Sequence, residues 1–230
     1  MVQPTGIHHI AVMTGDMRAQ LEFFTDVLGF ELVAIFDMHG VPDGLHAFLK
    51  LAADCAFSLV QLPGVEDIPI ELGKTHAGSG AGKSAGGTMQ HLAFKVDSRD
   101  ALIAMRDRIR SRGVNVFGPI DHGMCQSIYF AGPEQLSLEV AWSDSAINPK
   151  RLIYPATLAK ISVTPEEAER MIHPAPYDGE GGTVPQPPID PAKPHQAMPE
   201  AAYRQIMTMP DEVIWKVASY AESPVKRDAD

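Results

Sequence analysis

The hydrophobic pattern of residues 6–36 predicts a strand, a helix and a second strand. Residues 9–12 alternate between apolar side chains and small or polar ones, which is the period of a strand with one buried face. Asp16 is a suitable N-cap for the helix that follows. Apolar residues then recur at helical spacing before a C-capping glycine: Leu21, Phe24, Val27, Leu28 and Gly29. Two further strands are expected at 44–51 and 55–62.

The same pattern returns in the second half of the chain. Residues 89–96 alternate as a strand, and a helix begins after Ser98 and ends near Gly113. Three more strands are expected, at 114–118, 125–131 and 135–142. Aligning His9 with His91 superimposes the two halves, so the chain contains a repeated βαβββ unit. We therefore expect an α+β fold built from paired βαβββ modules.

The expected modules, 1–62 and 89–143, form one domain that spans residues 1–143. The loop that joins them, 63–88, is rich in Gly, Ala and Ser and is longer than most loops in compact domains, which is typical of a functional lid. Residues 144–230 form a proline-rich C-terminal extension that we expect to dock on the core or on a second subunit. Short helices are expected within it, at 164–172 and 199–222.

Composition narrows the classes of function. The net charge of −10 argues against nucleic acids and anionic membranes as partners. No apolar run approaches the roughly 18 residues of a membrane span, and the first residues show neither the basic nor the apolar block of a secretion signal. Cys55 and Cys125 are the only cysteines, and we expect both to be free thiols in a reducing cytoplasm. A cytoplasmic protein that acts on a small molecule is the expectation.

Three residues with metal-binding side chains lie on the non-core faces of the predicted strands. His9, His91 and Glu139 each alternate with apolar neighbours, so they point away from the helices. A single strand histidine is usually structural. A repeat-related pair of histidines with a carboxylate on the same kind of face instead indicates a metal site, because imidazole and carboxylate are common ligands of divalent ions.

Several segments resemble the vicinal oxygen chelate superfamily, which contains glyoxalases, epimerases, extradiol dioxygenases and resistance proteins. They are HHIAV and FFTDVLGFELV in the first module, and QHLAFKV and SIYFAGPEQLSLEV in the second. The resemblance covers residues 1–143. It implies a curved mixed sheet around one divalent ion (Fe, Mn, Co, Ni or Zn), and often a homodimer. Carried over onto this chain, the implied ligands are His9, Gln61, His91 and Glu139.

Two chemistries compete under this resemblance. The ligand set His, Gln, His, Glu is similar to that of methylmalonyl-CoA epimerase, which favours glyoxalase-type proton transfer or lyase chemistry through a metal-stabilised enediolate. A carboxylate such as Glu139, or a neighbour such as His46, then moves the proton. We take this as the first hypothesis.

The alternative hypothesis is Fe(II) extradiol ring cleavage, which needs two histidines and one carboxylate. The segment IDHGMCQSIYFAGPEQLSLE resembles the extradiol signature and implies that His122 and Tyr129 act in proton transfer. The segment departs from the signature at Gly132 and Gln135. The expected histidine pair is also replaced in DCAFSLVQ, where Ala56 and Phe57 stand at those places. A non-catalytic binding protein is a third hypothesis.

Residues 77–84, AGSGAGKS, satisfy a loose phosphate-loop pattern. That mechanism needs a strand before the loop and a helix after it, and neither is predicted here. A flexible lid over the metal site is the better interpretation, and we call this segment the lid loop. Its Lys83, together with Lys74, would be placed to meet an anionic substrate.

Overall fold

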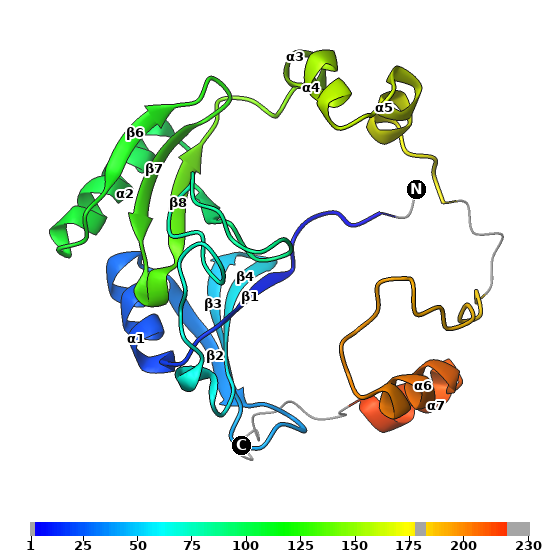
Figure 1. Cartoon of the computed structure of the whole chain (residues 1–230). Helices are drawn as coiled ribbons and strands as arrows, with labels where there is room; N and C mark the ends of the chain where they lie inside the picture. The colour runs from blue at the N-terminus through cyan, green and yellow to red at the C-terminus, as the bar shows by residue number, and fades with distance from the viewer. Residues whose placement is uncertain (1–2, 178–182, 220–230) are drawn as a thin grey trace. The chain divides into compact units, whose positions relative to one another are not determined.

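The structure is a computed structural model that describes residues 3–177 and 183–219 (Figure 1). It divides into two compact units. One spans Pro4–Pro174, and the other combines Met1–Gln3 with Ala175–Asp230. The first unit contains both predicted modules, so the site is described within it.

The first module has the predicted order of one helix and four strands. Its sheet has the strand order β1-β4-β3-β2, in which β1 runs parallel to β4 and the other neighbours are antiparallel. Its elements are β1 His9–Met13, α1 Met17–Glu22 continued by a π-helical turn Phe23–Val27, β2 Glu31–Asp37, β3 Leu45–Ala52 and β4 Cys55–Gln61.

The second module repeats this topology. Its strand order is β5-β8-β7-β6, with β5 parallel to β8. Its elements are β5 Leu92–Lys95, α2 Arg99–Ser111, β6 Phe117–Asp121, β7 Gln126–Ala131 and β8 Ser137–Trp142. The predicted α+β class with paired βαβββ modules is therefore confirmed. Strand β6 begins later than the predicted 114–118, because Val114 and Val116 pack against the core before the chain reaches the sheet edge.

Local signals in the sequence define the helices. The Asp16 side chain accepts a hydrogen bond from the backbone N–H of Ala19 at 2.9 Å, and Ser98 accepts one from Ala101 at 3.0 Å. Gly29 follows the first helical segment with a φ of 79°, a left-handed conformation that favours glycine. The predicted N-cap Asp16 is confirmed, and the second helix begins after Ser98 as predicted.

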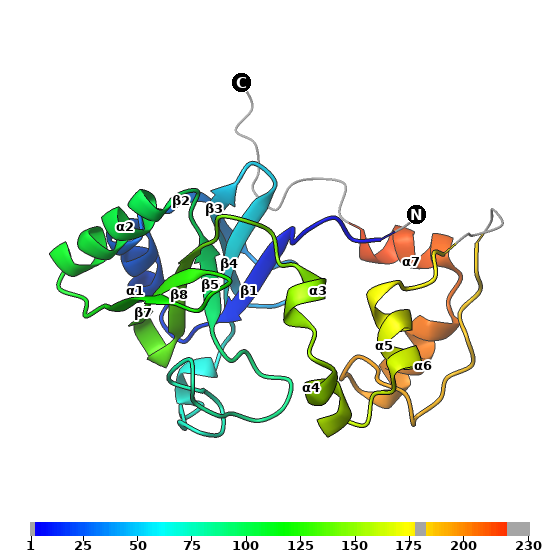
Figure 2. The same ribbon diagram turned by 90° about the horizontal axis from the view of Figure 1, so that it is seen from above.

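The two modules share one core. Helices α1 and α2 lie on the same side of the two sheets, and the inward faces of the strands pack beneath them (Figures 1 and 2). Phe94 of β5 joins the modules, because its ring centroid lies 5.0 Å from that of Phe30 and 5.9 Å from that of Phe57. The side chains that are completely buried come from both modules: Phe24, Leu49, Phe57, Leu59, Leu102, Ile109, Ile128 and Leu138. Burial of each stabilises the fold by about 1.5–3 kcal/mol.

A carboxylate from the second module also forms hydrogen bonds with the first module. Glu134, in the turn between β7 and β8, accepts hydrogen bonds from Thr14 Oγ1 at 2.5 Å, Gly15 N at 2.7 Å and Gln20 Nε2 at 2.7 Å. A Cβ at Gly15 would come within 2.9 Å of the Glu66 backbone, so glycine is required at this approach. These contacts join the start of α1 to the second sheet.

The C-terminal residues form short helices. The first unit includes α3 Pro149–Leu152, α4 Pro155–Lys160 and α5 Pro165–Ile172, of which α5 matches the helix expected at 164–172. The helix expected at 199–222 is instead two helices, α6 Glu200–Thr208 and α7 Asp211–Ala218, because proline at position 210 cannot continue the hydrogen bonding of α6. Residues 220–222 lie outside the described residues. None of the described helices combines the length and the apolar character needed to cross a bilayer.

Candidate functional site

His91 and Glu139 meet on the face of the second sheet that α2 does not cover. Strand β5 pairs with β8 so that Ala93 lies opposite Glu139, which places His91 one pleat away. His91 Nε2 lies 2.9 Å from Glu139 Oε2, and the Glu139 side chain is only 6% exposed. Such a buried carboxylate needs a positive charge or hydrogen-bond donors beside it.

The neighbouring Gln90 determines which nitrogen of His91 faces Glu139. The Gln90 amide nitrogen donates hydrogen bonds to the carbonyl oxygens of Ser79 at 2.9 Å and Gly82 at 3.1 Å. The amide oxygen must therefore point the other way, where it accepts a hydrogen bond from His91 Nδ1. Nε2 is then directed at the carboxylate. A proton shared between Nε2 and the carboxylate, or a metal ion held by both side chains, would satisfy this approach, so the donor set fits a metal.

Tyr129 and His122 lie beside this pair. Tyr129 on β7 is directly opposite Glu139, and His122 Nε2 is 2.9 Å from the Tyr129 hydroxyl oxygen. The rings of His91 and Tyr129 meet edge to face at 6.4 Å. Burial raises the pKa of Tyr129, and the negative charge of Glu139 raises it further. The Tyr129 hydroxyl therefore keeps its proton at neutral pH and can donate a hydrogen bond.

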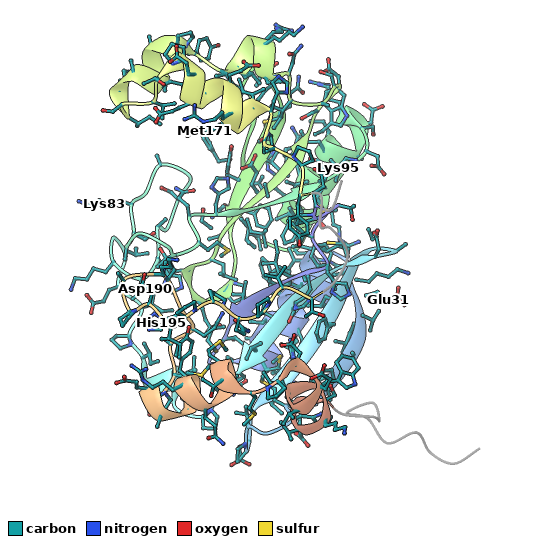
Figure 3. The ribbon with its side chains drawn as sticks, turned by 90° about the vertical axis from the view of Figure 1, so that its right-hand side faces the viewer. Glu31, Lys83, Lys95, Met171, Asp190 and His195 are labelled. Atoms are coloured by element: carbon teal, nitrogen blue, oxygen red, sulfur yellow. The ribbon has the colours of Figure 1, made fainter. Side chains whose placement is uncertain are left out.

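A cavity of about 780 Å³ opens onto these side chains. Its polar wall contains His91, His122 and Tyr129, and its apolar wall contains Phe117 and Ile120. The lid loop covers part of it with Gly78–Ala81. Among the described residues, no lysine or arginine lines this cavity. Two lysines were expected to meet an anionic substrate. Lys83 points away from the sheets (Figure 3), and Lys74 forms an ion pair with Glu71.

The structure does not join His9 to the pair. His9 is exposed at the start of β1, where its Nδ1 is 2.9 Å from His8 Nδ1 and its ring centroid is 5.6 Å from that of Phe48. Met13 of β1 and Met89, just before β5, line one cavity, so β1 lies beside the second sheet. In the described part of the chain, no three His, Cys, Asp or Glu side chains gather closely enough to hold a metal ion. As a metal ligand beside His91, His9 stays a prediction.

Gln61 is not brought to this group. In the parallel pairing of β1 with β4, His9 lies opposite Ala56, so Gln61 is five residues farther along the strand, a separation of about 16 Å. The Gln61 side chain instead accepts a hydrogen bond from the backbone N–H of Met17 at 2.9 Å, at the start of α1. In this structure the Gln61 side-chain oxygen is therefore already engaged at the start of α1.

When the two modules are superimposed by their strand register, Ser58 in the first module takes the position of Glu139 in the second. Ala11 lies opposite Ser58 in the first sheet, as Ala93 lies opposite Glu139 in the second. Ser58 is completely buried, and its hydroxyl lies 2.6 Å from His46 Nε2. Burial lowers the pKa of His46, and the charge of His9 lowers it further. The predicted His46 is thus a neutral base, but in the first module rather than in the cavity.

Sequence reasoning missed Gln90 and Ser58. The spacing of the repeat would have identified Ser58, since Ser58 follows His9 by 49 residues, close to the 48 residues that separate Glu139 from His91. No sequence signal identifies Gln90, because its role depends on a loop that has no repeat partner.

The chain is similar to several solved structures. A glyoxylase/bleomycin resistance protein/dioxygenase domain from Frankia sp. EAN1pec is 15% identical with a TM-score of 0.49, covering 61% of this chain and 99% of its own. TnmS3, an antibiotic binding protein from Streptomyces sp. CB03234, is 20% identical with a TM-score of 0.44, covering 63% and 100%. The fosfomycin resistance protein FosX from Listeria monocytogenes, in complex with Mn(II) and 1S,2S-dihydroxypropylphosphonic acid, is 17% identical with a TM-score of 0.43, covering 66% and 100%. No curated protein matches the sequence.

A family model matches more than half of the chain. It covers residues 6–140, which include most of both modules and all of the lid loop, and its description is the Glyoxalase/Bleomycin resistance protein/Dioxygenase superfamily. The match leaves out the C-terminal extension. The paired modules, the carboxylate–histidine pair between β5 and β8 and this match agree, and the chain belongs to the Glyoxalase/Bleomycin resistance protein/Dioxygenase superfamily.

Proposed function

We propose that this protein is a metal-dependent enzyme whose divalent ion is held by His9, His91 and Glu139. The observation that carries the proposal is the 2.9 Å approach of His91 Nε2 to the buried carboxylate of Glu139. Two imidazoles and one carboxylate suit a mid-series ion such as Fe, Mn, Co, Ni or Zn. When bound, the ion would supply Lewis-acid chemistry to a substrate with two adjacent oxygens.

The position of Gln61 favours oxygen chemistry over the epimerase hypothesis. With the Gln61 side chain engaged at the start of α1, the proposed ligand set contains two histidines and one carboxylate, which is the arrangement typical of non-haem Fe(II) oxygenases. We therefore propose extradiol-type cleavage of a dihydroxylated ring as the activity. The Tyr129 hydroxyl, which stays protonated, donates a hydrogen bond to a substrate oxygen, and His122 orients that hydroxyl and exchanges its proton.

The cavity supports an uncharged substrate. Phe117 and Ile120 offer an apolar wall to the body of the molecule, while His122 and Tyr129 offer polar atoms to its oxygens. A phosphorylated or carboxylated substrate would leave its charge without a cationic partner in the lining, which is costly in a partly enclosed cavity.

Glyoxalase-type proton transfer is the second candidate, and His46 is the observation that favours it. His46 is a neutral imidazole at neutral pH, and its Ser58 partner stands at the position that matches Glu139 in the repeat. A substrate that spans both modules would meet His46 as a base.

Oxygen consumption separates the two candidates. For the first candidate, protein loaded with ferrous iron is mixed with uncharged catechols in an oxygen electrode. For the second candidate, deuterium exchange of α-hydroxy ketones is measured in anaerobic buffer with Ni, Co or Zn. We expect oxygen uptake that Glu139→Gln abolishes. Exchange without oxygen uptake would replace the first candidate with the second. Tight ligand binding without either reaction would indicate a binding protein.

A further inference from the structure

Gln90 contacts the lid loop and His91 through opposite ends of one amide. Its nitrogen donates to the carbonyl oxygens of Ser79 and Gly82, and its oxygen accepts from His91 Nδ1. The side chain is half-buried and lies directly before the ligand histidine. Rotating the amide by 180° would place its oxygen against two carbonyl oxygens, so only one orientation satisfies both contacts.

The lid end of this amide closes a tightly folded loop. A Cβ at Gly82 would lie 1.8 Å from the Ala77 carbonyl oxygen, so the backbone approaches itself closely there. Gly80 lies over the Tyr129 ring, since a Cβ at that position would stand 3.6 Å from it. The two hydrogen bonds from Gln90 therefore hold the lid loop over the cavity at the point where it covers Tyr129.

The histidine end selects the form of His91 that can bind a metal. A hydrogen bond from Nδ1 to the amide oxygen requires the proton on Nδ1, which makes Nε2, on the side of Glu139, the nitrogen that can bind a metal ion. Outer partners of this kind orient ligand histidines and typically change metal affinity by about 10–100-fold when they are lost.

We propose that Gln90 is a positioning residue that couples closure of the lid loop to the metal-binding form of His91. The metal-dependent part rests on the proposed function, whereas the coupling between the loop and the imidazole does not. Closing the loop orients the amide, and the oriented amide holds the proton on Nδ1. Because coupling between two sites is reciprocal, an ion on Nε2 must in turn favour the closed loop.

Two substitutions separate the two ends of the amide. Gln90→Glu keeps an acceptor for His91 but places a carboxylate against the carbonyl oxygens of Ser79 and Gly82. Gln90→Leu removes both contacts. Gln126→Leu is the matched control, because Gln126 on β7 bonds to Arg99 and Asp121 and not to the lid loop.

Two readouts need no metal and no activity. The first is trypsin cleavage of the full chain after Lys83, the exposed lysine of the lid loop, with cleavage at Arg151 in α3 as an internal reference. The second is the ¹⁵N chemical shift of His91 Nδ1, which reports whether that nitrogen carries a proton. We expect cleavage after Lys83 to rise about 10-fold in both Gln90 variants, which corresponds to two lost hydrogen bonds. We expect the Nδ1–H form of His91 to persist in Gln90→Glu and to become mixed in Gln90→Leu.

Zn(II) added alone then tests the reciprocal effect. Zn(II) should slow cleavage after Lys83 in the wild-type protein by about 5-fold or more and should leave Gln90→Leu unchanged. Unchanged cleavage and unchanged ring shifts in both Gln90 variants would overturn the inference, as would equal slowing by Zn(II) in all variants. If the wild-type protein binds no metal, the proposed function fails, and the two metal-free readouts still decide the role of Gln90.

Discussion

His91 Nε2 and Glu139 Oε2 lie 2.9 Å apart although the two residues are separated by most of the second module. The parallel pairing of β5 with β8 brings them together, and His91 also lines the cavity on the face opposite α2. Glu139 is almost fully buried, so it cannot be hydrated as a free carboxylate. This pair is the centre of the proposed metal site.

Gln61 should matter for stability and not for metal. Its side-chain oxygen accepts the N–H of Met17, one of the unpaired donors at the start of α1. We expect Gln61→Ala to lower the free energy of unfolding by about 1 kcal/mol, measured by urea denaturation, and to leave metal affinity unchanged. Gln205→Ala, at an exposed position of α6, serves as the control and should have little effect. Loss of metal in Gln61→Ala would restore Gln61 to the ligand set.

Glu134 should contribute strongly to the association of the modules. Its carboxylate accepts three hydrogen bonds from the first module, and bonds to a charged group contribute more than neutral ones. We expect Glu134→Gln to lower the free energy of unfolding by about 2 kcal/mol, measured by urea denaturation. Glu31→Ala removes an exposed ion pair at 3.8 Å from Lys50 and should cost at most about 1 kcal/mol. Equal effects of the two substitutions would contradict the role assigned to Glu134.

The stability of the protein should depend on pH through His46. The pKa of His46 in the folded chain is lowered from its ordinary 6.5, first by burial and then by His9, so the unfolded chain binds more protons. The contribution of His46 to stability is therefore complete above pH 6.5 and is lost as the pH falls below that value. The melting temperature of the wild-type protein should fall more steeply between pH 7 and pH 5 than that of His46→Asn. Parallel curves for the two proteins would exclude this role.

Tyr129 and His122 should affect turnover more than binding. Under the proposed activity, the Tyr129 hydroxyl donates to a substrate oxygen and His122 exchanges its proton, so both act on the reacting atoms. We expect Tyr129→Phe and His122→Phe to lower kcat by about 100-fold or more while KM changes little. Steady-state oxygen uptake gives both constants. A change confined to KM would mean that the pair only binds the substrate.

Much of the fold is predictable because its signals are local or repeated. The two-residue period of the strands, the caps at Asp16 and Ser98 and the match of His9 with His91 together specify two βαβββ modules. Proline 210 is also a local signal, because it separates α6 from α7 within the range 199–222, where one helix was expected. The division of the chain after residue 143 stays a prediction.

The candidate site is less predictable because it depends on register and on a loop. The alternation of apolar and polar residues places His9, His91 and Glu139 on the strand faces that point away from the helices. It does not say which residue of β4 lies opposite which residue of β1. That register moves Gln61 away from His9 and puts Ser58 in the place that matches Glu139. The contacts of Gln90 arise from the path of the lid loop, which no periodicity describes.

Anaerobic titration of metal-free protein with ferrous iron tests the proposed metal site most directly. We predict one ion per chain, an affinity about 100-fold weaker or more in His9→Ala and in Glu139→Gln, and unchanged affinity in Gln61→Ala. Circular dichroism of each variant establishes that the fold is retained. A wild-type protein that binds no ion, or a Glu139→Gln variant that binds iron as tightly as the wild type, would contradict the account.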